Sequence, residues 1–209
     1  MLFFCASAKH CVHKAAFTPY NSSQYYHSEK ADLTLSKHRI PSRIFLVGPM
    51  GAGKTTIGNK LAEILNKQFI DSDYEIEQKT GASIPLIFEL EGEIGFRKRE
   101  TQILEELTQK NNTILATGGG AIISAKNRAL LKRTGFVIYL QAPLDQLLKR
   151  TAKDRNRPLL QTENPRKVLA KLLEQREPYY QEVADLIYET NQKPLRDIAA
   201  EITQLLEKL

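Results

Sequence analysis

The chain has 209 residues, enough for one domain with a full hydrophobic core, and 42% of them are hydrophobic while 26% are charged, as in ordinary soluble globular proteins. No apolar run approaches the ~18 residues of a membrane span, so we expect no membrane insertion. The formal charge is +6, of which residues 1–40 carry +3, and the nearly balanced remainder argues against a nucleic-acid-binding surface.

Cysteine and histidine are confined to the beginning of the chain. Every one of them precedes residue 41: Cys5, His10, Cys11, His13, His27 and His38. This distribution excludes Cys or His nucleophiles, His general bases and Cys/His metal sites from the rest of the chain. Phosphoryl transfer remains possible, because it depends mainly on positioning and on neutralising charge.

Residues 1–40 lack sustained periodicity and end at Pro41, so we expect a flexible N-terminal extension before a compact domain at 41–209. The first residues make a poor secretory signal, because no basic region precedes their short apolar stretch. We therefore expect a cytoplasmic protein. The acidic-poor composition leaves organelle targeting as a minor alternative. The cluster His10-Cys11-x-His13 has no second ligand cluster to complete a metal site.

The segment from Gly48 to Thr55 matches G-x-x-x-x-G-K-[ST] and follows the apolar run 44–47. Glycines let such a loop curl until several backbone N–H groups point at one phosphate. Lys54 would reach the β- and γ-phosphates, and the Thr55 hydroxyl would bind Mg²⁺. A chance glycine-rich turn is the alternative, which the surrounding strand and helix pattern disfavours.

After this loop, short strand patterns alternate with helical patterns. Strands are predicted at 44–47, 69–71, 113–116, 136–140 and 186–189, and helices at 54–65, 73–79, 93–110, 126–133, 144–152, 166–183 and 194–206. The alternation predicts an α/β fold, a doubly wound parallel sheet with helices on both faces. Ligands of such sheets bind beyond the carboxyl ends of the strands.

Two carboxylates, Asp71 and Asp73, follow the second predicted strand. Helix capping would explain them in isolation. Beside a phosphate loop, one carboxylate can hold Mg²⁺ through water while the other accepts a proton from an attacking hydroxyl.

Three consecutive glycines, 118–120, follow the third predicted strand. They would let the backbone approach a ligand closely, although a merely permissive loop is the alternative. Arg97 and Glu100 lie three residues apart on one predicted helix face, where the acid could orient the guanidinium; a solvated helix is the alternative.

Residues 153–165 are polar and interrupted by proline, which predicts a mobile lid, unless they form an ordinary solvated loop. Its arginines could close over phosphates and stabilise transferred charge. Arg176, near the end of the following helical pattern, could form an anion clamp with Arg97 if the fold brings the two together.

Taken together, these motifs resemble the shikimate kinase family over residues 43–209. The matching segments are Phe45–Gly58, Asp71-Ser-Asp73, Gly92-Glu-x-Gly-Phe-Arg97, Gly118–Gly120, Arg157-Pro-Leu-Leu160 and Arg176. The resemblance implies a three-layer P-loop kinase fold with a five-stranded parallel sheet and a mobile lid. It also implies ATP-dependent phosphorylation of the shikimate 3-hydroxyl, in chorismate and aromatic amino-acid biosynthesis.

The resemblance also implies roles for individual residues. Lys54, Asp73 and Arg157 would be catalytic, with Asp73 assisting deprotonation of the substrate hydroxyl. Thr55 would bind one Mg²⁺ per subunit directly and Asp71 would bind it through water. The set that would bind ATP is Gly51, Ala52, Gly53, Lys54, Thr55, Thr56, Arg157 and, as a weaker assignment, Lys193. The set that would bind shikimate is Asp73, Arg97, Gly119 and Arg176.

Two other functions remain open on the sequence. One is a related small-molecule kinase, of the gluconate or nucleotide type; the other is a catalytically silent nucleotide-binding module. The expected partners are the small molecules ATP and shikimate, without nucleic acid or membrane. We expect a monomer, although the sequence does not reveal the oligomeric state.

Overall fold

The computed structural model describes residues 40–152, 164–191 and 193–209. Five strands form one parallel sheet in the order β2-β3-β1-β4-β5. Their bounds are β1 Arg43–Val47, β2 Gln68–Asp71, β3 Thr113–Ala116, β4 Phe136–Gln141 and β5 Leu186–Glu189. All five strands lie within a residue or two of the predicted positions, so the predicted parallel α/β sheet is confirmed.

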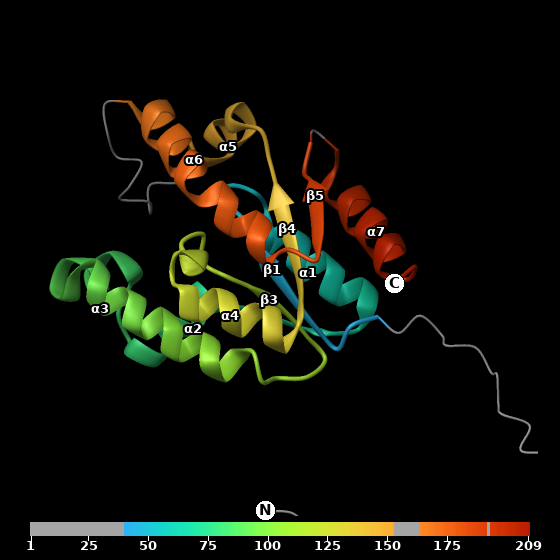
Figure 1. Ribbon diagram of the computed structural model, residues 1–209, viewed down its shortest axis with the longest axis horizontal. Helices are drawn as coiled ribbons and strands as arrows, with labels where there is room; N and C mark the ends of the chain where they lie inside the picture. The colour runs from blue at the N-terminus through green and yellow to red at the C-terminus, as the bar shows by residue number, and fades with distance from the viewer. Residues whose placement is uncertain (1–39, 153–163, 192) are drawn as a thin grey trace, which may run out of the picture. The chain divides into compact units, whose positions relative to one another are not determined.

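Helices connect the strands and cover both faces of the sheet (Figure 1). They are α1 Lys54–Leu65, α2 Ser72–Thr80, α3 Ile84–Leu107, α4 Ala125–Thr134, α5 Leu144–Thr151, α6 Pro165–Val183 and α7 Leu195–Leu206, with a 3₁₀ turn, η1, at Ala121–Ile123. None of the helices in the described part of the chain is long and apolar enough to cross a membrane.

The core consists of two layers because alternate residues of each strand point to opposite faces. Phe45 and Val47 of β1 pack with side chains of α3, α4 and the end of α6. Ile44 and Leu46 pack with α1, α5 and α7 on the other face. Strands buried on both faces read as continuous apolar runs, which explains the unbroken Ile-Phe-Leu-Val pattern of β1.

The prediction for α3 was wrong at its start. The helix begins at Ile84, nine residues before the predicted 93, because Ser83 caps it and accepts a hydrogen bond from the Leu86 N–H. Gly92 then interrupts the helix with φ 67° and ψ −176°, so two helical pieces meet there. The predicted start at 93 corresponds to the second piece, which carries Arg97 and Glu100.

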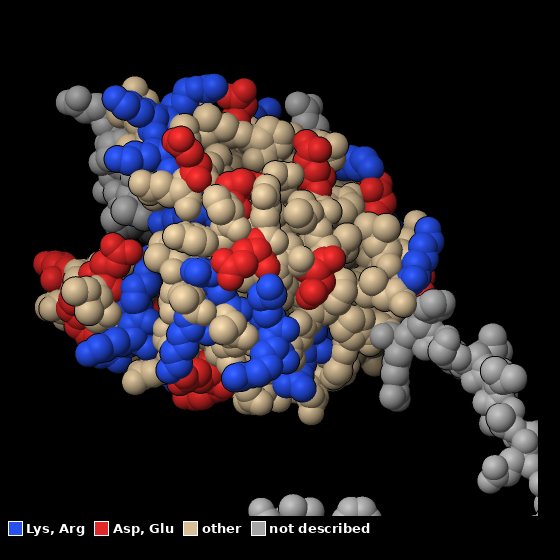
Figure 2. Space-filling model, viewed as in Figure 1, with Lys and Arg blue, Asp and Glu red and all other residues tan. Residues whose placement is uncertain are grey.

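Lys and Arg side chains gather along the lower edge in Figure 2, and acidic side chains lie among them. The two signs of charge are thus interspersed on this face.

Candidate active site

The loop between β1 and α1 has the backbone that the glycine motif predicted. Gly48, Gly51 and Gly53 have positive φ angles of 145°, 80° and 98°. A Cβ at Gly48 would lie 2.6 Å from the Leu140 carbonyl oxygen, so no side chain fits there. Gly53 is also the N-cap of α1, so the loop leads directly into a helix N-terminus, where backbone N–H groups favour an anion.

Lys54 folds back over this loop. Its Nζ donates hydrogen bonds to the carbonyl oxygens of Gly48, at 2.7 Å, and Pro49, at 2.9 Å. The ammonium group is therefore held at the mouth of the loop.

A cavity of about 460 Å³ opens above the loop, and we call it the loop cavity. Its lining residues are Met50, Gly51, Gly53, Lys54, Thr55, Thr56, Asp71, Asp73, Thr117, Gly119, Arg150 and Lys193. Ala52, which the resemblance assigns to ATP binding, is fully buried in the core and does not line this cavity.

The side chains predicted to hold Mg²⁺ lie together. The Thr55 hydroxyl donates to Asp71 Oδ2 at 2.8 Å, although the two residues are 16 apart in the chain. Asp71 Oδ1 also accepts from the Asp73 N–H at 3.0 Å, so Asp71 caps α2 as well. Oδ1 of Asp71 therefore caps the helix, while Oδ2 bonds to Thr55, the other residue predicted to hold Mg²⁺. One carboxylate is compatible with both interpretations.

These donors fit Mg²⁺ in particular. The described residues contain no group of three or more Asp, Glu, His or Cys side chains that could hold a metal by themselves. Mg²⁺ needs no such group, because it keeps several waters and binds through one or two protein oxygens together with substrate phosphates.

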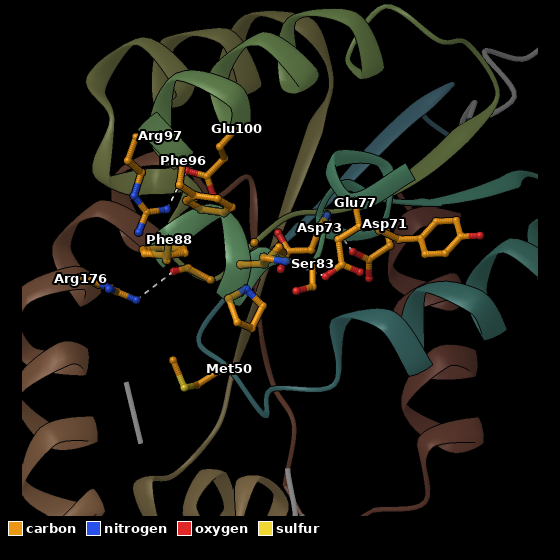
Figure 3. A pocket seen from close by; sticks show the side chains of 16 residues that line it. Met50, Asp71, Asp73, Glu77, Ser83, Phe88, Phe96, Arg97, Glu100 and Arg176 are labelled. Atoms are coloured by element: carbon orange, nitrogen blue, oxygen red, sulfur yellow. Dashed lines mark hydrogen bonds and ion pairs between the residues drawn. The ribbon is translucent and has the colours of Figure 1, made fainter. Parts of the chain in front are cut away.

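A second and larger cavity, of about 730 Å³, adjoins the first, and we call it the arginine cavity (Figure 3). Asp73, Arg97, Gly119 and Arg176 all line it, so the fold brings the predicted substrate residues together. The other lining residues are Met50, Asp71, Tyr74, Glu77, Ser83, Ile84, Pro85, Phe88, Phe96, Glu100, Gly118 and Gly120. Met50, Asp71, Asp73 and Gly119 line both cavities, so a ligand in one can meet a ligand in the other at these residues.

Arg97 is held in place by two acids. Its NH1 donates to Glu100 Oε2 at 2.7 Å, and its NH2 donates to Glu93 Oε1 at 3.2 Å. Its guanidinium also lies over the Phe96 ring, 5.2 Å from the centroid. Fixing a guanidinium in this way lowers the entropy lost when it binds a planar anion.

Glu100 is fully buried, so the solvated-helix alternative for this segment is wrong. Its Oε1 atom has no hydrogen-bond partner among the described residues. Burial, with a smaller contribution from the nearby Asp73, raises the pKa of Glu100 to about 7, although the positive charges of Arg97 and Arg176 act in the opposite direction. The sequence pointed to Glu100 as an orienting acid, but not to this burial.

Two of the three glycines at 118–120 lie directly against functional side chains. A Cβ at Gly118 would lie 2.6 Å from Asp73 Oδ1 and 2.9 Å from Glu100 Oε1. A Cβ at Gly120 would lie 2.4 Å from Arg97 NH2. The glycines therefore let the backbone approach the functional side chains, and the permissive-loop alternative does not explain them.

Arg176 lies on α6 and lines the same cavity as Arg97 (Figure 3). Its NH1 donates to the Gly119 carbonyl oxygen at 3.4 Å. Pro178 follows two residues later inside the helix and has no N–H to donate to the preceding turn.

No sequence motif indicates a functional role for Arg150. It lies in the last turn of α5, lines the loop cavity and donates to the Gly51 carbonyl oxygen at 3.2 Å. Its position beside Lys149 at a helix end carried no motif, so only the fold places it at the phosphate loop. Lys193 lines the same cavity and pairs with Glu201 at 2.6 Å.

Arg157 lies outside the described residues, as does most of the predicted lid, 153–163. Asn164 and Pro165, which the prediction also included in the lid, form the cap and first residue of α6. The predicted N-terminal extension, apart from residue 40, is outside the described residues as well.

A phosphate loop with its lysine, neighbouring hydroxyl and carboxylate oxygens and an adjoining cavity lined by two arginines, all at the carboxyl end of a parallel sheet, are the features of a P-loop kinase of small molecules. The sequence profile of the shikimate kinase family matches residues 50–207. The chain belongs to the shikimate kinase family, and it is an enzyme of the shikimate pathway.

Individual relatives agree with this assignment. Shikimate kinase of Acinetobacter baumannii is 59% identical over 163 residues, which are 78% of this chain and 91% of the relative. Shikimate kinase of Nitrosococcus oceani is 56% identical over 165 residues, 79% of this chain and 87% of the relative.

Solved structures agree with the assignment as well. A structure of the Acinetobacter baumannii enzyme in complex with shikimate is 56% identical and covers 86% of this chain and 97% of its own, with a TM-score of 0.78. A gluconokinase from Sinorhizobium meliloti is only 19% identical, with a TM-score of 0.55, and shares the fold alone.

Proposed function

We propose that the chain transfers the γ-phosphoryl group of ATP to the 3-hydroxyl of shikimate, giving shikimate 3-phosphate and ADP. The observation that carries this proposal is the junction of the two cavities. A phosphate loop lines one cavity, two arginines line the other, and Asp73 and Gly119 line both. A phosphate donor and a carboxylate-bearing acceptor would therefore meet beside Asp73.

ATP would occupy the loop cavity. Backbone N–H groups of Gly51–Thr56 would bind its phosphates, and the Lys54 ammonium would exchange the carbonyl oxygens of Gly48 and Pro49 for phosphate oxygens. Thr55 would hold Mg²⁺ directly and Asp71 through water, one ion per subunit. When bound, Mg²⁺ neutralises charge on the transferred phosphoryl group.

Shikimate would occupy the arginine cavity. Arg97 and Arg176 would bind its carboxylate, and the backbone at Gly119 would contact the ring substituents. Asp73 would accept the proton of the 3-hydroxyl as its oxygen attacks the γ-phosphorus and the bond to the ADP oxygen breaks. Glu100 would keep Arg97 oriented toward the carboxylate.

The remaining assignments are also part of the proposal. Arg157, in the predicted lid, would stabilise the transferred charge. Arg150 and Lys193 would contact the nucleotide at the far side of the loop cavity. Residues 1–40 would be an extension to a kinase domain at 41–209. We propose a cytoplasmic monomer without nucleic-acid or membrane partners, with organelle targeting by the extension as the minor alternative.

A coupled ADP-release assay with the purified chain tests the substrate. Shikimate, gluconate and nucleoside monophosphates are offered separately with ATP and Mg²⁺. Turnover with shikimate, and with neither of the other two kinds of acceptor, supports the proposal. Preferred turnover of gluconate would replace it with the gluconate-type alternative, and no turnover with any acceptor would favour a silent nucleotide-binding module.

A further inference from the structure

Tyr180 is a fully buried residue of α6, one turn after Arg176. Its hydroxyl donates a hydrogen bond of 2.6 Å to the Gly119 carbonyl oxygen. Arg176 donates to the same oxygen at 3.4 Å. Two side chains of α6 therefore hold one carbonyl of the glycine segment, and the Tyr180 bond is much the shorter.

Contacts with β4 and α6 hold the Tyr180 ring in place. It stacks on Tyr139 of β4, with ring centroids 4.9 Å apart and planes 15° from parallel. The Tyr139 hydroxyl donates to Glu177 Oε2 at 2.6 Å, and Gln141 donates to the other oxygen of Glu177 at 3.0 Å. The sheet and α6 thus clamp the ring, so the hydroxyl has little freedom to leave the carbonyl.

The protonation state of the Tyr180 hydroxyl also matters, because only the protonated group can donate a hydrogen bond. Burial raises the pKa of Tyr180, and the nearby positive charge of Arg176 only partly opposes this shift. The group is therefore protonated at neutral pH, where it can donate to Gly119.

The bond bears directly on the proposed acceptor site. The peptide that joins Gly119 to Gly120 is planar and trans, so fixing its carbonyl fixes the Gly120 N–H on the opposite edge. Gly120 lies so close to Arg97 that a Cβ there would meet the guanidinium. A shift of this one peptide would change the distance from the glycine segment to both arginines.

We propose that Tyr180 is a positioning residue for the acceptor, whose hydroxyl sets the place of the Gly119–Gly120 peptide between Arg176 and Arg97. This inference rests on the proposed function, because the acceptor is taken to be the carboxylate held by these arginines. Tyr180 itself touches no reacting atom.

The test compares three Tyr→Phe variants in steady-state assays with shikimate and ATP. Tyr180→Phe keeps the stacked ring and loses one donor, so we expect the KM for shikimate to rise about fivefold to tenfold, as for one lost hydrogen bond, with the KM for ATP unchanged. Tyr139→Phe removes the neighbouring hydroxyl in the same stack. Tyr179→Phe removes the hydroxyl of an adjacent, partly exposed tyrosine whose ring packs on Arg128.

We expect Tyr139→Phe to lower the melting temperature while both KM values stay within about twofold of the original, since its hydroxyl bonds to Glu177 and not to Gly119. Tyr179→Phe should change neither property. Equal KM values for shikimate in Tyr180→Phe and Tyr139→Phe would overturn the inference. The change in KM would then come from weaker packing of the two stacked rings and not from the lost bond to Gly119.

A second pair of variants keeps the volume of the side chain. Replacing Tyr180 with p-aminophenylalanine retains a donor, whereas p-methylphenylalanine fills the same space without one. Recovery of the KM for shikimate by the amino group alone supports the inference, and equal KM values for the two replacements would refute it. Failure of the proposed function would appear differently, as absence of shikimate turnover in the unmodified chain.

Discussion

The two halves of the site are built in opposite ways. The loop cavity takes half of its lining residues from one short segment, 50–56, whose glycine backbone and one lysine line it. The arginine cavity is assembled from α2, α3, the glycine segment after β3 and the end of α6, and its functional groups are side chains. The loop cavity therefore depends to a large extent on one short segment, whereas the arginine cavity forms only when distant segments come together in the folded chain.

This difference determines how each half can fail. The backbone donors of the loop survive most substitutions, because they need only the glycines and the start of α1. The arginine cavity instead depends on charged groups that hold each other, such as Arg97 with the buried Glu100. We therefore expect substitutions in the loop cavity to slow phosphoryl transfer, and those in the arginine cavity to impair acceptor binding as well.

Asp73 belongs to both cavities, and its substitution should have the largest effect. Asp73→Asn removes the proposed proton acceptor, so we expect kcat to fall by about 10²–10⁴ while ATP binding measured by calorimetry is nearly unchanged. Glu75→Gln, in the same turn of α2 but outside the lining of either cavity, is the matched control. Loss of ATP binding in Asp73→Asn would contradict the assigned role.

Lys54 tests the loop cavity by itself. Lys54→Met removes the charge that would neutralise the transferred phosphoryl group, so we expect kcat to fall by about 10²–10³. Shikimate binding, measured by calorimetry without ATP, should persist. Lys60→Met, which breaks a surface ion pair with Glu63 on the same helix, should leave both properties unchanged. Unchanged turnover in Lys54→Met would contradict the proposed role of the loop in phosphoryl transfer.

Arg97 tests the arginine cavity by itself. Arg97→Ala removes a charged hydrogen-bonding partner of the carboxylate and should raise the KM for shikimate roughly 10–100-fold, with ATP affinity nearly intact. Arg99→Ala is the control, because Arg99 pairs with Glu91 on the same helix and is much more exposed. A larger change in ATP affinity than in shikimate affinity would show that the two halves are not separable in this way.

The same difference explains what could be predicted from sequence. The loop at 48–55 was recognisable because spacing alone defines it, and the strands because strands buried on both faces are apolar throughout. The first piece of α3 was missed because Pro85 and Gly92 interrupt its helical pattern, although Ser83 and Pro85 are the cap and first-turn signals of a helix.

Contacts between distant segments could not be predicted from spacing. Nothing near Arg150 indicates that α5 ends against the phosphate loop, since Gly51 is 99 residues away. The Tyr180 bond to Gly119 spans 61 residues. An anion clamp of Arg97 and Arg176 could be predicted only on the condition that the fold brings them together. The structure places both in one cavity and adds that Arg97 pairs with a fully buried acid.

Substitution of the buried Glu100 should have the smallest effect. Because Glu100 lines only the arginine cavity, the pH dependence of this effect belongs to that half of the site. The pKa of Glu100 is about 7 in the folded protein, above its ordinary value of 4.5, so the folded state binds more protons than the unfolded state between these values. Stability from this group is therefore present at low pH and is lost as the pH rises toward 7 and above. A shift of this size corresponds to at most roughly 3 kcal/mol.

Glu100→Gln should remove this pH dependence while keeping the shape of the side chain. We expect the free energy of unfolding of the original chain, measured in urea relative to Glu100→Gln, to fall by about 1–3 kcal/mol between pH 5 and pH 8. Glu93 contacts the same guanidinium from an exposed position. Because Glu93→Gln still contains Glu100, it should keep the pH dependence of the original chain. Parallel pH curves for the original chain and Glu100→Gln would mean that Glu100 is ionised throughout, and that Arg97 fully offsets its burial.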